Sequence, residues 1–163
     1  MPIALTVSRR GQVLDNVVET LRGMRLTGGY HWTVRSESVD TDPRNVMGIA
    51  AEECPFFIVE GSPEGRRDFE PASQLRDAFR VMITAVLFAE GTAPHRKAAA
   101  GETMAGDLER LLTRDLSRGG YATDTRVLSP EIMVALGGGG GEANRVVVVQ
   151  EIECAIHRTH GEP

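Results

Sequence analysis

Five consecutive glycines, residues 137–141, are the first feature that could do chemistry, because glycine-rich loops hold phosphate in many proteins. A phosphate-binding loop also needs a helix after the glycines, and the P-loop pattern adds a lysine and a hydroxyl. Here Glu142 follows the glycines, and its charge would repel phosphate. The valine-rich run after it is typical of a strand. The pattern therefore predicts a hairpin tip around Gly139 and no nucleotide site.

Three side chains that can bind metals, Cys154, His157 and His160, follow one another at intervals of three. In a strand, residues three apart point to opposite faces, so Cys154 and His157 cannot share an ion unless the chain bends. We therefore expect no metal site. The only other cysteine, Cys54, also stands in an apolar segment, and neither cysteine forms a CxxC pair. Both are predicted to be buried free thiols.

The sequence lacks the residue patterns that hydrolytic enzymes use to form a catalytic site. No serine stands in a G-x-S-x-G turn. The acids Asp115, Asp124 and Glu131 fall by pattern on a helix end, a strand and a turn, so nothing brings them together. We expect no catalytic activity and no cofactor.

Residues 62–73, SPEGRRDFEPAS, predict a loop between strands, with Arg66 and Arg67 at its exposed tip. A solvated loop is one interpretation. A loop that contacts a partner is the other, since long loops on a rigid sheet often carry function. Arg66, Arg67 and Gly139 are therefore the candidate partner-contact residues.

Charge and length limit the class of protein. The net charge of −5 argues against a protein whose main task is to grip DNA, because such proteins need basic surface. It does not exclude a protein that DNA merely passes. No apolar run approaches the roughly 18 residues that cross a bilayer, and the N-terminus lacks the order of a signal peptide. We expect a protein made in the cytoplasm, with no membrane partner, and 163 residues forming one domain.

The hydrophobic pattern predicts two helices, at residues 11–24 and 95–117, which glycines end. In the second helix Asp107 is expected to face solvent, opposite an apolar side formed by Met104, Leu108, Leu111, Leu112 and Leu116.

Alternating or continuous apolar residues predict strands. The longest is expected to be central and covered on both faces over its second half. Because strands cluster without β–α–β alternation, we expect an α+β fold, a mostly antiparallel sheet of about five to six strands with two helices packed on one face. A flexible tail is expected from about residue 158. The predicted strands are residues 30–39, 54–61, 74–91, 121–128, 131–136 and 144–157, with a loop at 40–53.

Residues 107–128, DLERLLTRDLSRGGYATDTRVL, resemble a stretch of the tail terminator (minor tail or tail completion) proteins of long-tailed bacteriophages and related prophages. In that family a helix of the form D-x-E-x-x-L ends in D-x-x-R-G-G and runs into a strand containing D-T. The layout of the other elements also agrees, whereas the glycine tip, the loop at 38–53 and the final RTHGEP depart from the family. The family-motif residues are Asp107, Leu111, Asp115, Arg118, Gly119, Gly120, Asp124 and Thr125.

The resemblance implies a structural protein at the head-proximal end of a virion or gene transfer particle tail. It implies a homo-oligomeric ring, usually of six copies, that caps the tail tube and offers its other face to the head connector. DNA would pass through without sequence-specific binding. A head–tail joining (neck) protein is one alternative. A small α+β enzyme or ligand-binding domain is another, and it would need convergent polar groups in a pocket.

Overall fold

The structure is a computed structural model that describes residues 8–62, 66–69, 74–89, 94–134 and 144–159. Its two helices are α1 (Arg9–Arg22) and α2 (Pro94–Leu112). Short 3₁₀ turns η1 to η4 occupy Leu26–Gly28, Ser36–Ser38, Val46–Gly48 and Ala51–Glu53. The strands are β1 (Val39–Asp40), β2 (Phe56–Gly61), β3 (Arg66–Phe69), β4 (Gln74–Phe88), β5 (Asp124–Val127), β6 (Glu131–Val134) and β7 (Arg145–Thr159).

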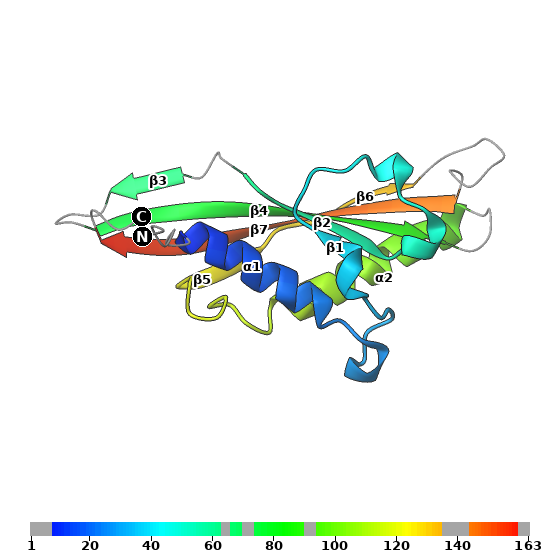
Figure 1. Ribbon diagram of the computed structural model, residues 1–163, viewed down its shortest axis with the longest axis horizontal. Coiled ribbons are helices and arrows are strands. Elements are labelled where there is room, and N and C mark those ends of the chain that lie inside the picture. The colour runs from blue at the N-terminus through cyan, green and yellow to red at the C-terminus, as the bar shows by residue number, and fades with distance from the viewer. Residues whose placement is uncertain (1–7, 63–65, 70–73, 90–93, 135–143, 160–163) are drawn as a thin grey trace, which may run out of the picture.

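The strands form one sheet in the order β1-β2-β4-β7-β5, with β3 also pairing with β4 and β6 with β7 (Figure 1). The α+β fold is confirmed, but the sheet is mixed rather than mostly antiparallel. The two-residue β1 runs parallel to β2, whereas the other pairings are antiparallel. The reason is the connection after β1, which crosses the sheet before β2 begins and so returns in the same direction.

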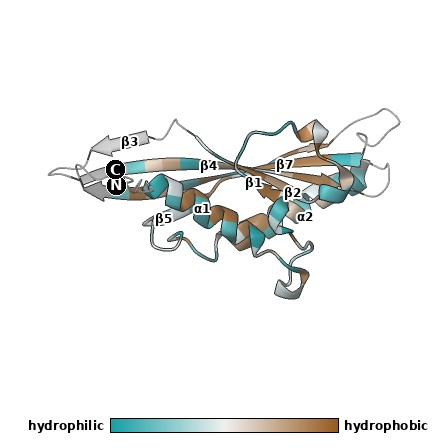
Figure 2. Ribbon diagram, viewed as in Figure 1, coloured by the Kyte–Doolittle hydropathy of each residue, from teal (hydrophilic) through white to brown (hydrophobic). Residues whose placement is uncertain are grey.

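Both helices pack on one face of the sheet, as the sequence predicts (Figure 1). Helix α1 begins at Ser8, whose side chain accepts a hydrogen bond from the Gly11 amide at 3.2 Å. Hydrophobic residues alternate with hydrophilic ones along it (Figure 2). The buried residues of both helices join alternate residues of the strands in the main core, which includes Val17, Leu21, Phe57, Val81, Ile83, Leu108, Val148 and Ile152.

A smaller hydrophobic cluster lies on the opposite face, which we call the far face. It consists of Ile49, Phe56, Ile58 and Val86, with Val46 and Cys54 packed against it. The segment between β1 and β2 covers it (Figure 1). The predicted double coverage of the second half of β4 is therefore confirmed, since Val86 is buried here while Ile83 is buried in the main core.

A bulge divides the edge strand beside β7. Strands β5 and β6 pair with the same edge of β7, but the register shifts by one residue between them. Pro130, which has no N–H for the ladder, stands at this break. The buried side chain of Gln150 fills it, because its amide donates to the carbonyls of Leu128 and Glu151.

The predicted strand at residues 30–39 is wrong except for its last residue, where β1 begins. The alternation did reflect burial, since Tyr30 and Val34 are buried. The backbone, however, pairs with no strand there. The Val34 amide donates to the Met24 carbonyl at 3.0 Å, and the Arg25 guanidinium donates to the Val34 carbonyl at 2.7 Å.

Other boundaries also differ from expectation, by two or three residues at the ends of α1 and at the starts of β2 and β5, and in three further places. Helix α2 ends at Leu112 rather than at residue 117, and Leu116 is exposed beyond it. The predicted loop 62–73 contains β3, which pairs with β4. Strand β7 runs to Thr159, so residues 158 and 159 belong to it and not to the expected tail. Among the described helices, none combines the length and apolarity that a bilayer span requires.

Candidate functional site

The turn between α2 and β5 contains four of the eight family-motif residues, and Asp115 organises its first half. The Asp115 carboxylate accepts hydrogen bonds from the Ser117 amide at 3.0 Å, the Ser117 hydroxyl at 2.7 Å and the Gly119 amide at 2.7 Å. The hydroxyl of Ser117, and then the two amides and the charge of Arg118, hold the pKa of Asp115 below its ordinary value. Asp115 therefore shapes the turn that places Arg118.

Arg118 points into the protein and is fully buried. Its φ of 49° lies in the left-handed region, where residues other than glycine are uncommon. The Nε atom donates to the hydroxyl of Thr125 at 3.2 Å, and Nη2 donates to the carbonyl of Leu112. Leu112 is the last residue of α2, so a cation here also opposes the negative end of the helix dipole. Burial lowers the pKa of the guanidinium.

Thr125 of β5 completes the connection. Its hydroxyl donates to the Leu116 carbonyl at 2.7 Å while accepting from Arg118. The thiol of Cys154 on β7 lies 3.6 Å from the same oxygen and is the donor there, because the Thr125 proton is already engaged. The turn, β5 and β7 thus meet at Thr125, and Arg118 connects it to the end of α2.

The two glycines of the motif allow the chain to reverse beside Arg118. Gly119 and Gly120 have φ values of 69° and 88°, which residues with a Cβ rarely adopt. At Gly119 a Cβ would also come within 3.2 Å of the Asn16 side chain of α1. Asp124 is exposed, and its side chain accepts from the Thr125 amide at 2.9 Å. Leu111 is buried in the main core.

Asp107 lies away from this turn and is buried, which corrects the expectation that it faces solvent. Its carboxylate accepts from the His31 amide at 2.8 Å and from Arg110 at 3.1 Å, and the His31 Nδ1 atom lies 3.1 Å away. Arg110 also donates to the Gly29 carbonyl. The sequence did hold a signal, because Asp107 stands within the apolar spacing between Met104 and Leu108.

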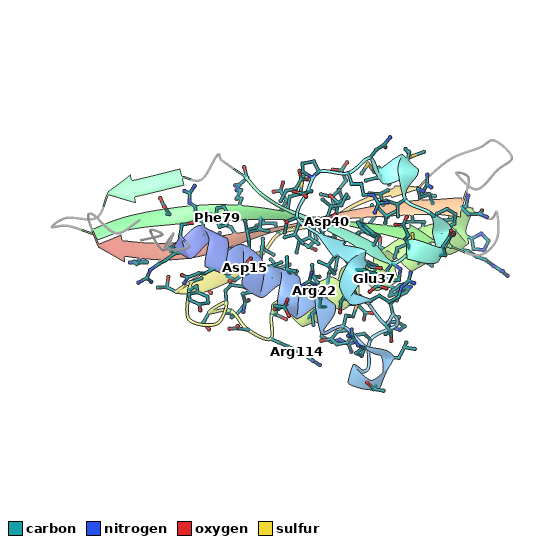
Figure 3. The ribbon with its side chains drawn as sticks, viewed as in Figure 1. Asp15, Arg22, Glu37, Asp40, Phe79 and Arg114 are labelled. Carbon is teal, nitrogen blue, oxygen red and sulfur yellow. The ribbon has the colours of Figure 1, made fainter. Side chains whose placement is uncertain are left out.

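Two arginines of the α2 end cover the ring of Tyr30. The guanidinium carbons of Arg110 and Arg114 lie 4.5 and 4.9 Å from the ring centre, and Figure 3 labels Arg114. Arg22, also labelled there, donates from α1 to the Ser36 carbonyl at 3.2 Å. Residues 29–36, which have no strand partner, are therefore held by side chains of both helices.

Replacing Asp107 with alanine is expected to lower the free energy of unfolding by about 2 kcal/mol, because the His31 amide and Arg110 lose a buried, charged acceptor. Urea unfolding followed by the fluorescence of Trp32, the single tryptophan, would measure this. Asp107→Asn should lose less, since it keeps one acceptor oxygen for the amide. Glu109→Ala, on the exposed side of α2, is the control, and equal effects of Asp107→Ala and Glu109→Ala would contradict the assignment.

The structure does not bring the other predicted residues to this turn. Arg66 and Arg67 lie in β3, opposite Ala78 and Asp77 of β4, rather than at a loop tip. The run of residues 137–141, with Gly139, lies outside the described residues, although the strands on either side, β6 and β7, do pair antiparallel.

The cysteines and histidines give no metal site among the described residues, where no cluster of three or more potential ligands is found. Cys154 is buried in the main core, as predicted, and Cys54 is only partly buried. Burial raises the pKa of both thiols, that of Cys54 to about 11.

Taken together, the motif residues direct their polar groups to carbonyls, amides and hydroxyls of the protein itself. This arrangement can hold α2, β5 and β7 in register, and the described part of the chain gathers no nucleophile, base and acid around it. No model of a known protein family matches the sequence, and a search of curated proteins finds no significant similarity. The tail-terminator resemblance of residues 107–128 therefore stays a prediction.

Proposed function

We propose that this protein is a structural subunit of a phage-like tail, of the tail terminator type. Copies would assemble into a ring that caps the tail tube and then presents its other face to the head connector. The observation that carries the proposal is the segment 107–128, in which the residues matching the family motif lie in α2, in the turn after it and in β5. Their role as structural links is what a non-catalytic assembly protein needs.

The shape of the sheet supports an assembly role. Strands β4 and β7 pair over 15 residues each, a ladder of about 50 Å, and one end extends past α1 with β3 alongside (Figure 1). Among the described residues, the end of β7 after Ala155 pairs with β4 alone, and β3 has a partner on one edge only. Unpaired strand edges are ready sites for association with another chain.

Charge supports a ring that DNA passes through rather than one that holds DNA. The net charge of −5 disfavours binding to the phosphate backbone. A head–tail joining protein would share this property, so the choice of partner distinguishes the two candidates.

We expect the purified protein, alone or mixed with tail tubes, to form a closed ring of about six copies. Analytical ultracentrifugation across concentration, followed by negative-stain imaging, would measure the mass and the symmetry. Tubes with rings at one end support the terminator role, and rings that bind only the connector favour a neck protein. A monomer or dimer that binds neither would contradict the proposal.

The same assay tests where neighbouring copies or partners touch. The double variant Arg66→Glu/Arg67→Glu should keep its circular dichroism spectrum but impair assembly, if β3 is a contact strand. Arg96→Glu, an exposed position on α2, provides a matched charge reversal elsewhere. Normal assembly of the β3 variant would remove β3 from the contact without affecting the ring itself.

A further inference from the structure

We propose that residues 41–54, which we call the strap, open as a unit while the rest of the protein stays folded. Opening would uncover the hydrophobic cluster on the far face. The strap is thus a conformational device that switches this part of the sheet between a covered and an exposed apolar surface. The inference does not rest on the proposed function.

The strap packs on its own small cluster, separated from the main core by the sheet. Ile49 is its one fully buried hydrophobic side chain, and Val46 and Cys54 are partly buried. The sheet side of the cluster comes from β2 and β4. Segments with few buried apolar contacts open at lower free energy than the core does. The main core would lose no helix contact when the strap leaves.

The backbone of the strap bonds mostly to itself, so it can move without losing its local turns. The Gly48 amide donates to the Asn45 carbonyl at 2.9 Å, and the Glu53 amide donates to the Ala50 carbonyl at 3.1 Å. The Glu53 carboxylate accepts from the Ala50 amide at 2.8 Å and from Arg44 at 3.1 Å. These bonds lie within η3, η4 and their flanks, and opening breaks none of them.

Arg145, the first residue of β7, is the main clasp. Its side chain is buried, and it donates to the Ile49 carbonyl at 2.7 Å. It also contacts the sulfur of Met47 at 3.8 Å, and its guanidinium carbon lies 5.1 Å from the ring centre of Phe88. Two further ties lie at the strap's end, where the Ser38 hydroxyl donates to the Glu53 carbonyl at 2.9 Å and Arg35 donates to the Glu52 carbonyl. The guanidinium carbon of Arg44 also lies 5.0 Å from the ring centre of Phe56. Opening therefore requires the release of these contacts and of the Ile49 side chain.

An apolar surface lies beneath the strap. Phe56, Ile58 and Val86 are 2 %, 3 % and 0 % exposed with the strap in place. Val147 pairs with Val86 across the β4–β7 ladder and continues the same face. An open strap would therefore join the covered cluster to a neighbouring apolar strand.

The two native cysteines report on the two cores separately. Cys54 ends the strap, with its thiol donating to the Ala50 carbonyl at 3.4 Å, whereas Cys154 lies in the main core. Labelling with dithionitrobenzoate, with the modified cysteine identified by peptide mass, would follow both. We expect Cys54 to react at least about 100-fold faster than Cys154, each rate taken relative to the unfolded chain, and with a weaker dependence on urea.

Arg145→Met tests the clasp, and it should speed the labelling of Cys54 about tenfold or more relative to that of Cys154. Ile49→Ala should act in the same direction if the first variant folds poorly. Arg126→Met, at an exposed arginine of β5, is the matched control and should change neither rate. The proposal would be overturned if both cysteines were labelled at the same relative rate and with the same steep dependence on urea, because both would then react only through global unfolding. A Cys54 rate that neither variant changes would overturn it as well, since it would mean direct access without opening.

Discussion

Replacing Arg118 with alanine should lower the free energy of unfolding by about 3 kcal/mol or more, the largest effect that we expect from any polar residue of the motif. The guanidinium is fully buried and joins the last carbonyl of α2 to the hydroxyl of Thr125. Truncation leaves a cavity of several heavy atoms and removes donors from two buried acceptors. It also removes the cation that bonds to the Leu112 carbonyl at the C-terminal end of α2.

Urea unfolding of the purified variants would measure the effect, with two replacements separating its causes. Arg118→Met fills most of the volume without the donors, and Arg118→Lys keeps the charge without the planar fork. Both should lie between the wild type and Arg118→Ala. Arg114→Ala is the matched control, because Arg114 is exposed and stacks on Tyr30. A loss for Arg118→Ala no larger than for Arg114→Ala would contradict the linking role.

Gly101→Val should also destabilise the protein, by about 3 kcal/mol, although valine favours helix formation over glycine. Gly101 is buried in α2 where the helix crosses the sheet. A Cβ at this position would lie 2.5 Å from Cγ2 of Ile132 and 3.2 Å from Cγ1 of Val146. Because both neighbours are β-branched and stiff at χ1, the helix or β6 must shift.

Gly106→Val provides the matched control in the same helix. Gly106 is exposed, and a Cβ there would meet no atom within 4 Å. The substitution should therefore leave stability unchanged or raise it by a few tenths of a kcal/mol, through helix propensity alone. Thermal unfolding by circular dichroism would compare the two variants. Effects of the same sign and size would mean that α2 does not approach β6 and β7 as closely as described.

The motif residues show how far the sequence could indicate side-chain positions. The family resemblance grouped Asp115, Arg118 and Thr125, and in the structure Arg118 interacts with both of the others. It could not indicate that Arg118 is buried, because arginine is almost always exposed and burial depends on what surrounds the turn. The same limit applied to Asp107, whose partner His31 lies 76 positions away in the sequence.

The clasp of the strap illustrates the same limit on the far face. Arg145 begins a valine-rich strand, and from the sequence it is an ordinary charged residue at a strand end. Its acceptor, the Ile49 carbonyl, lies 96 positions away. No local pattern links the two residues, since the contact depends on the strap crossing the far face of the sheet and reaching the start of β7.

The sequence by itself determined the elements whose signal is local and periodic. The apolar stripe of α1, the long two-faced run of β4 and the valine-rich β7 each reflect burial of one side or both sides of a regular element. These patterns were sufficient for the α+β class and for the placing of both helices on one face.

Only the tertiary structure decided the features that depend on distant partners. Residues 30–38 alternate like a strand but have no strand beside them, so their backbone bonds instead to side chains of α1 and α2 and to Arg25. The polar β3 is a strand because β4 extends far enough to pair with it. The parallel pairing of β1 with β2 depends on the path of the strap across the sheet. In each case a backbone hydrogen bond takes the partner that folding brings near, and local composition does not specify that partner.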